Sequence, residues 1–364
     1  MPTVVAKIGT SSLTDERGVI AEAAIVRVCE QVASLRAAGD RVVVVTSAAV
    51  ASGLEALGMG DRRPSDVLTL QAVSAVGQSR LMHVWDSAFA AVGLISGQVL
   101  LTPNDFFDRR QYLHARNTLN RLLDLGVVPV VNENDAIATD ELRFGDNDRI
   151  AALVAHLVAA DVLVLLTDTA GLFTANPRTD PTATLIEHVD EVTSALEAAA
   201  GAGGSARGSG GMASKLRAAK IASWSGVRAV IAGSVSPSAL LDAVAGKPGT
   251  GTHVAAHHRW LSARKLWIAF AGDSEGVLRV DEGAKRALIE RGVSLLPAGV
   301  TATSGAFEVG DLVEIAGPDG RPFARGVSRA SASEAAAVLG RRSADLPEGA
   351  VTLLVHRDDL VLLP

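Results

Sequence analysis

The first two-thirds of the chain alternates short apolar runs with longer segments in which apolar residues recur every three or four positions. This alternation predicts an α/β fold, with an open and mostly parallel sheet sandwiched by helices. The predicted strands are Val4–Ile8, Arg41–Thr46, Leu94–Leu101, Val127–Val131, Val162–Leu166 and Val227–Ala232. The predicted helices are Ala21–Ala38, Asp66–Ala91, Leu113–Leu125 and Met212–Ser225.

The pattern changes in the last quarter of the chain, where short apolar runs are separated by turns rich in Gly and Pro, such as Gly305–Gly310. These short runs predict a smaller, β-rich C-terminal domain. We therefore expect three parts: a large domain over residues 1–256, a linker over 257–273 and the small domain over 274–364. Within the large domain, the Gly/Ala/Ser tract Ala198–Gly211 predicts a flexible loop.

Composition and charge limit what such a protein binds. The 364 residues suffice for two domains, and the net charge of −6 argues against general binding to nucleic acids or anionic membranes. The single cysteine, Cys29, excludes an internal disulfide framework and falls at helical spacing with apolar residues, so we expect it to be buried. The apolar stretch Ala151–Leu166 contains His156 and Asp161, which favours a helix and a strand over a membrane span. With no leader at the N-terminus, the sequence predicts a cytoplasmic protein.

Two lysines lie in patterns that can hold a phosphate. Lys7 ends the first predicted strand and is followed by Gly9 and three hydroxyl residues, although an ordinary solvent-facing lysine fits the same pattern. The tract Gly208–Lys215 opens a helix, where glycines admit a ligand and the helix N-terminus attracts anions; a plain linker is the alternative. The tract is not a Walker A loop, and no strand leads into it as a dinucleotide fingerprint requires.

Polar residues also gather where strands end. Asn132–Asp135 follow a buried run, and Phe144–Arg149 pack two carboxylates and an amide into the start of a helix, although each segment alone also fits a turn or a helix cap. Because ligands of open α/β sheets bind at the carboxyl ends of the strands, we expect these segments to surround a ligand. No histidine has metal-ligand spacing, so no protein metal site is predicted.

Taken together, these segments resemble the glutamate 5-kinases of the amino-acid kinase family. The matching motifs follow the family's order along nearly the whole chain. They are Lys7–Ser11, Val45–Ala48, Tyr112–Thr118, Val131–Asp135, Phe144–Asp148, Leu166–Asp168, Gly171–Thr174, Gly210–Lys215, Val280–Ala284, Ser294–Gly299 and His356–Leu360. The resemblance implies an amino-acid kinase domain followed by a C-terminal PUA domain, a small β-barrel-like module.

The implied reaction transfers the γ-phosphoryl group of ATP to the side-chain carboxylate of L-glutamate, the first step of proline synthesis. The resemblance also implies Mg²⁺, feedback inhibition by proline, a homo-oligomer and glutamyl phosphate reductase as a partner. Two alternatives stay open: another acyl-phosphate-forming amino-acid kinase, and an RNA-binding protein that acts through its PUA domain. From Gly276 to Pro364 there are 10 Lys and Arg residues against 12 Asp and Glu residues, which argues against RNA.

The resemblance also assigns roles to single residues. Lys7 and Lys215 would hold the transferring phosphoryl group, and Asp148 would orient both lysines. The substrate-binding positions are Ser47, Asp135 and Asn147. The nucleotide-binding positions are Lys7, Thr167, Asp168, Ser209, Gly210, Gly211, Met212, Ala213, Ser214 and Lys215. Ala48 departs from the glycine usual in the family, so the conformation of the loop after Ser47 is not predicted.

Overall fold

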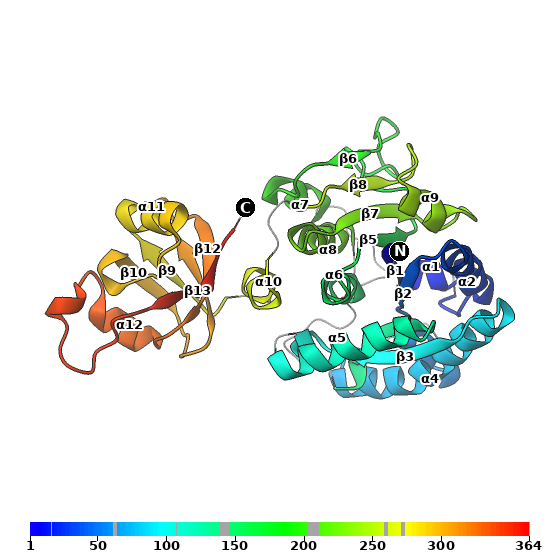
Figure 1. Cartoon of the computed structure of the whole chain (residues 1–364), viewed down its shortest axis with the longest axis horizontal. Helices are drawn as coiled ribbons and strands as arrows, with labels where there is room; N and C mark the ends of the chain where they lie inside the picture. The colour runs from blue at the N-terminus through cyan, green and yellow to red at the C-terminus, as the bar shows by residue number, and fades with distance from the viewer. Residues whose placement is uncertain are drawn as a thin grey trace. The chain divides into compact units, whose positions relative to one another are not determined.

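The computed structural model describes residues 1–15, 17–60, 64–106, 108–137, 146–201, 211–257, 261–270 and 274–363. The chain divides into two compact units, Met1–Trp260 and Leu261–Pro364 (Figure 1). The predicted linker therefore straddles both units, and it contains a helix, α10 (Ala263–Phe270), which packs on strands of the second unit.

An eight-stranded sheet forms the centre of the described part of the first unit, in the order β3-β4-β2-β1-β5-β7-β8-β6. Its neighbours are parallel except for β8, which runs antiparallel to β7. The predicted α/β fold with a mostly parallel sheet is confirmed. The strands are β1 (Thr3–Ile8), β2 (Arg41–Val45), β3 (Ser96–Leu101), β4 (Val128–Glu133), β5 (Val162–Thr167), β6 (His188–Val189), β7 (Arg228–Gly233) and β8 (Thr252–Val254).

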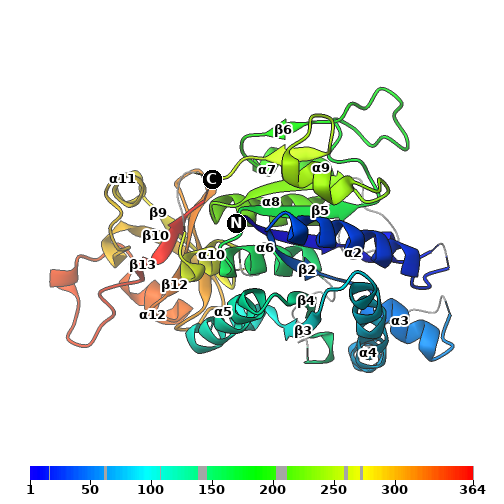
Figure 2. The same ribbon diagram turned by 45° about the vertical axis from the view of Figure 1, so that its right-hand side comes forward.

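Helices cover both faces of this sheet (Figures 1 and 2). One layer contains α2, α4 and α9, and the other contains α5, α6 and α8. The helices are α1 (Thr10–Leu13), α2 (Glu22–Ala37), α3 (Ala49–Ala56), α4 (Val67–Ala91), α5 (Arg109–Asp124), α6 (Asn147–Leu157), α7 (Ser194–Gly201), α8 (Met212–Trp224) and α9 (Ala239–Ala245), with 3₁₀ turns η1 (Pro103–Phe106) and η2 (Asp135–Ile137). In the described part of the chain, no helix has the length and apolar character needed to cross a membrane.

Alternation along β1 decides which side chains reach which layer. Val4, Ala6 and Ile8 pack in the apolar core with α2 and α4, as does the fully buried Cys29. Because successive side chains of a strand point to opposite faces, Lys7 lies on the other face, where α6 and α8 pack. Burial raises the pKa of the Cys29 thiol to about 12, which keeps it protonated and unreactive, as its helical spacing predicted.

Two local predictions need correction. Asn132 and Glu133 were expected in a polar loop, but they are the last residues of β4, 1% and 3% exposed. The Asn132 side chain donates to Gln78 and accepts from the backbone N–H of Glu133, so its polarity did not end the strand. The tract Ala198–Gly211 was expected to be a loop throughout. Instead, α7 continues into this tract as far as Gly201, because alanine favours helix, and Gly211 is the N-cap of α8. Residues 202–210 lie outside the described residues.

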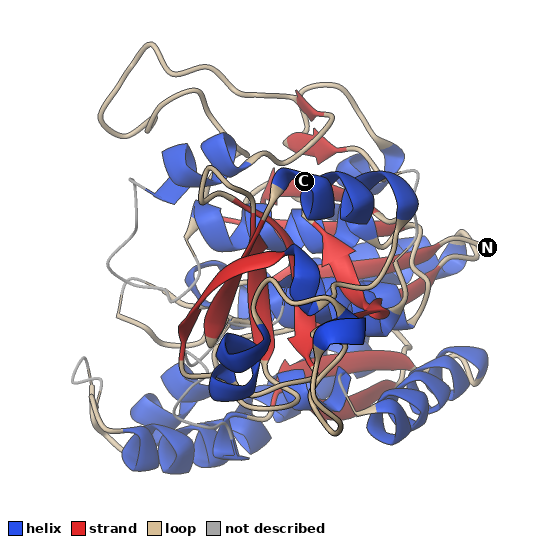
Figure 3. Ribbon diagram, turned by 90° about the vertical axis from the view of Figure 1, so that its left-hand side faces the viewer, coloured by secondary structure: helices blue, strands red, loops and turns tan. Residues whose placement is uncertain are grey.

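The described part of the second unit contains a five-stranded sheet in the order β10-β9-β11-β12-β13. Among the described strand pairs of this sheet, only β9 and β11 are parallel. Apolar side chains from the strands and from α11 and α12 form a separate core that includes Phe307. Figure 3 distinguishes the strands, in red, from the helices, in blue. The elements after α10 are β9 (Gly276–Val280), α11 (Glu282–Arg291), η3 (Pro297–Gly299), β10 (Val300–Gly305), β11 (Leu312–Ala316), β12 (Pro322–Ser328), α12 (Ala332–Val338), η4 (Ser343–Asp345) and β13 (Val355–Leu362).

Candidate active site

The structure brings three charged residues from distant parts of the sequence into contact. Lys7 lies near the end of β1, Asp148 in the first turn of α6 and Lys215 in the first turn of α8. The Nζ atom of Lys7 is 2.5 Å from Oδ1 of Asp148, and the Nζ atom of Lys215 is 3.2 Å from Oδ2. One carboxylate thus holds both ammonium groups in place, each through its own oxygen. We call these three residues the lysine cluster.

The lysine cluster is buried, and its electrostatics follow from that burial. Desolvation lowers the pKa of the Lys7 ammonium; Asp148 opposes this shift and the charge of Lys215 adds to it. Desolvation alone would raise the pKa of Asp148, but the two lysine charges outweigh it and hold the pKa of that carboxyl below its usual range. Asp148 is therefore ionised. The environment of Lys7 does not fully stabilise its positive charge, so an incoming anion can stabilise it further.

The start of α8 adds backbone donors beside the lysine cluster. Gly211 is the N-cap of this helix and Met212 its first residue, so the cap residue has no side chain that could accept from the first backbone N–H groups. Ser214 donates from Oγ to Oδ1 of Asp146 at 2.7 Å, and Asp146 in turn caps α6. The first turns of α6 and α8 are therefore joined, and both helices begin at the lysine cluster. Ser209 and Gly210 lie outside the described residues.

The three predicted substrate-binding residues are buried near the ends of β2 and β4. Ser47 follows β2, and Ala48 after it has φ of 85° and ψ of 14°, the left-handed conformation that normally favours glycine. The chain therefore keeps this backbone shape without the glycine. Asp135 begins η2, directly after β4. Asn147 is the first residue of α6, and its Oδ1 atom accepts a hydrogen bond from the backbone N–H of Glu133 at 3.1 Å.

Two predicted nucleotide-binding residues lie at the end of β5. Thr167 is its last residue, and its carbonyl accepts a hydrogen bond from the backbone of Ser234 at 2.7 Å. Asp168 follows, accepts from the Thr167 hydroxyl at 3.1 Å and forms an ion pair with Arg178 at 2.9 Å. Because β5 pairs in register with β1, these residues lie at the same sheet edge as Lys7.

Several residues that hold this site together were not singled out from the sequence. Asp146 was only one of two carboxylates in a helix-start motif, although capping residues are a recognisable signal. Ser74 and Gln78 of α4 donate to Asp135 and accept from Asn132, respectively. The small residues Ser74 and Gly77 within a long apolar helix are a signal of close packing that the periodicity alone did not identify.

Comparison with known proteins agrees with this architecture. A model of the amino acid kinase family matches residues 2–233, and a model of the PUA domain matches residues 276–349. The chain is 47% identical to the glutamate 5-kinase of Rhodococcus opacus and 44% identical to that of Burkholderia multivorans, over 99% of this chain and 97% of each relative. The carbamate kinase of Giardia lamblia, solved bound to AMP-PNP, matches 70% of this chain and 98% of its own at a TM-score of 0.50 and 17% identity, which reflects a shared fold.

The order of motifs, the two matched domains and the similarity along the full chain therefore agree with one another. The resemblance inferred from the motifs is confirmed, as is the PUA domain expected at the C-terminal end. This chain belongs to the amino acid kinase family, within its glutamate 5-kinases.

Proposed function

We propose that this protein transfers the γ-phosphoryl group of ATP to the side-chain carboxylate of L-glutamate and so forms L-glutamyl 5-phosphate, the first intermediate of proline biosynthesis. The observation that carries the proposal is the lysine cluster, in which two buried ammonium groups face one carboxylate. The name shared by the full-length relatives supports glutamate as the acceptor.

The chemistry requires charge compensation rather than a base. The γ-carboxyl group of free glutamate has a pKa near 4.3, so it is ionised at pH 7 and attacks the γ-phosphorus without losing a proton. The bond to the β–γ bridging oxygen breaks as the new acyl phosphate bond forms, and ADP leaves with the electron pair. Lys7 and Lys215 stabilise the negative charge spread over the transferring group, and Asp148 keeps both ammonium groups oriented.

We propose that residues near the ends of β2 and β4 and at the start of α6 bind the substrate. We propose that Asp135 binds the ammonium group of glutamate, since a buried carboxylate can form a strong charge-assisted hydrogen bond there. Ser47 and Asn147 supply a hydroxyl and an amide for the two carboxylates of the substrate. Thr167, Asp168 and residues 209–215 bind the nucleotide, with the start of α8 and Lys215 directed to its phosphates.

The described residues do not fit a protein-held metal site, because no group of three or more His, Cys, Asp or Glu side chains among them converges as metal ligands would. Asp148, the carboxylate nearest the expected phosphates, is already engaged by two lysines. We propose that Mg²⁺ enters bound to the phosphates of ATP, since substrate phosphates supply part of the ligand set of this ion in kinases.

Three further assignments rest on the family alone. Free proline inhibits by competing with glutamate, because both carry an ammonium group and a carboxylate that can occupy one pocket. The chain forms a homo-oligomer and supplies its unstable acyl phosphate to glutamyl phosphate reductase. Its reaction takes place in the cytoplasm, as its need for ATP favours.

An ADP-release assay with a panel of acidic substrates tests the proposed function. We expect release to depend on L-glutamate and Mg²⁺, and hydroxylamine to trap a γ-hydroxamate. L-aspartate and N-acetyl-L-glutamate serve as matched controls, because the first shortens the side chain and the second removes the ammonium charge. Turnover with either control at or above the rate with glutamate would contradict the proposal.

A further inference from the structure

One face of α4 carries polar and small residues instead of the apolar residues expected of a helix that packs on a sheet. Ser74, Gly77 and Gln78 lie at positions i, i+3 and i+4, which places them together on the helix surface. Gly77 packs against α3: a Cβ atom at Gly77 would lie 1.8 Å from the carbonyl oxygen of Ala49. Since Ala49 begins α3 directly after Ser47 and Ala48, this face of α4 supports the loop that follows β2.

The same face also contacts the end of β4 and the 3₁₀ turn η2 that follows it. Gln78 accepts a hydrogen bond at Oε1 from Nδ2 of Asn132 at 2.7 Å. Ser74 donates from Oγ to Oδ2 of Asp135 at 3.0 Å, across 61 positions of sequence. The side chains of Ser74 and Asp135 are buried, 3% and 6% exposed, so water does not compete for this bond. The helix therefore contacts the segments after β2 and β4 that carry two of the proposed substrate-binding residues, Ser47 and Asp135.

The hydrogen-bond acceptor of Ser74 is unusual for a serine within a helix. A buried serine within a helix commonly donates to the carbonyl four residues earlier in its own helix. Ser74 donates instead to a carboxylate on another element, and a hydrogen bond to a charged acceptor is stronger than one to a carbonyl. Because α4 is held by backbone contact with α3, the hydroxyl is a fixed donor that selects one orientation of the Asp135 carboxylate.

We propose that Ser74 is a positioning residue for glutamate binding: it orients Asp135 toward the ammonium group of the substrate without touching the substrate itself. This inference rests on the proposed function, since it assigns the ammonium group to Asp135. Its consequence is specific. Loss of the Ser74 hydroxyl weakens the binding of ligands that carry the ammonium group, and leaves ATP binding and the phosphoryl-transfer step intact.

Steady-state kinetics of the full-length Ser74→Ala variant tests this proposal. We expect the KM for L-glutamate to rise about tenfold, equal to about 1.4 kcal/mol, with kcat and the KM for ATP within about twofold of wild type. Ser74→Cys keeps the side-chain volume but replaces the hydroxyl with a weak donor, so it should raise the glutamate KM in the same way. This variant replaces Ser74→Ala in the test if the alanine variant folds poorly. Ser74→Thr, which keeps the hydroxyl, should restore most of the affinity. Ser79→Ala removes an exposed hydroxyl from the same helix and is the matched control.

A double-mutant cycle distinguishes action through Asp135 from a general packing effect. In the Asp135→Ala background the hydroxyl has lost its acceptor, so adding Ser74→Ala should not raise the glutamate KM further. Additive effects, an unchanged KM in Ser74→Ala, or a fall in kcat at unchanged KM would each overturn the inference. Failure of the wild type and of Ser79→Ala to release ADP with glutamate would instead overturn the proposed function, and this inference with it.

Discussion

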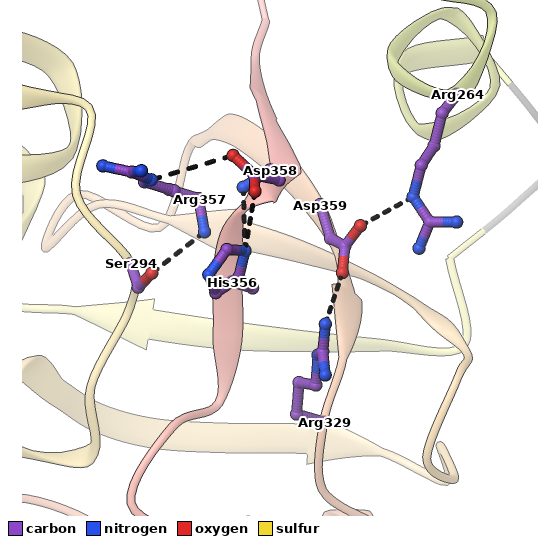
Figure 4. Close-up of polar contacts among 7 residues, drawn as sticks. All are labelled: Arg264, Ser294, Arg329, His356, Arg357, Asp358 and Asp359. Carbon is purple, nitrogen blue, oxygen red and sulfur yellow. Dashed lines mark hydrogen bonds and ion pairs between the residues drawn. The ribbon is translucent and has the colours of Figure 1, made fainter.

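Each unit of the molecule contains a carboxylate held between two cationic side chains, and the two clusters differ in their access to water. In the first unit, the side chains of Lys7 and Lys215 are 6% and 7% exposed around Asp148. In the second unit, Asp359 accepts from Arg264 at 2.6 Å and from Arg329 at 3.0 Å, and these arginine side chains are 60% and 52% exposed (Figure 4).

Similar charges therefore have different consequences. Around Asp359, water and salt screen the arginines, so the two contacts contribute about 1 kcal/mol or less each. The Arg264 contact joins α10 to β13, and the Arg329 contact joins the end of β12 to β13. Around Asp148, burial removes that screening, and desolvation lowers the pKa of the Lys7 ammonium. An exposed cluster of this kind is a structural tie, whereas a buried one keeps charge available for an anionic ligand.

Removal of one buried cation should give the largest effect. We expect Lys215→Ala to lower kcat about a hundredfold or more, the scale of losing one preorganised electrostatic contact to a transition state. Arg329→Ala, which removes a cation from the exposed cluster, should leave kcat unchanged. ADP-release kinetics measure both. A rise in the KM for ATP with normal kcat in Lys215→Ala would show that this lysine contributes to ATP binding. The catalytic difference between the buried and the exposed cluster would then not hold.

Replacement of each central carboxylate tests stability. Asp148→Asn leaves two buried ammonium groups without their carboxylate, so we expect the free energy of unfolding to fall by about 3 kcal/mol. Asp359→Asn should cost less than about 1 kcal/mol, because its arginines remain hydrated. Urea denaturation of both variants measures the difference. Equal losses would show that burial does not separate the clusters.

The pH dependence of the same experiment has a defined sign. A lysine whose pKa is lowered in the folded state binds fewer protons there than in the unfolded chain, over the pH range between the lowered pKa and 10.5. The contribution of Lys7 to the free energy of unfolding therefore rises with pH in that range. The loss in Asp148→Asn should shrink as the pH approaches 10.5, and the loss in Asp359→Asn should not.

Backbone strain in the segment after β2 should have a smaller effect. Ala48 adopts a left-handed conformation that costs an L-residue about 1 kcal/mol, and glycine avoids most of this cost at some expense in chain entropy. We expect Ala48→Gly to raise the free energy of unfolding by about 0.5 kcal/mol. Ala49→Gly, at the next position but within α3, should lower it by about the same amount. Thermal melting compares the two variants with wild type. Destabilisation by Ala48→Gly would show that the backbone at Ala48 is not strained.

Salt should produce the smallest effect. Arg329→Gln removes one exposed ion pair, so we expect a loss of no more than about 0.5 kcal/mol in dilute buffer. At 1 M salt the screening length is about 3 Å, and the difference from wild type should vanish. A loss that persists at 1 M salt would show that the arginine acts through packing rather than charge.

The sequence predicted the elements that carry a strong period. The ends of β1, β2 and α2 fall within about a residue or two of the apolar runs that predicted them, because burial on both faces of a parallel strand leaves little ambiguity. The resemblance supplied Lys7, Asp148 and Lys215, and the structure brings them together. Their contact could not follow from periodicity, because it depends on how α6 and α8 pack on the sheet.

Other features were not predictable for identifiable physical reasons. The two-residue β6 and three-residue β8 are too short to show alternation. The left-handed conformation of Ala48 has no local signal, since alanine rarely adopts it. The Ser74–Asp135 hydrogen bond joins a helix and a 3₁₀ turn that are far apart in sequence, and a serine in an apolar helix does not identify its partner. Tertiary contacts determine all three features.

The position of β1 has a consequence for how the chain folds as it is synthesised. This first strand occupies the middle of the sheet, between β2 and β5. β2 emerges from the ribosome soon after β1, but β5 is made only after β3, β4 and the helices between them. One edge of β1 therefore lacks its native neighbour through much of translation, and unpaired edges promote association with other chains. Ribosomes that stall before Val162 should consequently release fragments that aggregate, whereas a stall after β7 leaves the centre of the sheet complete.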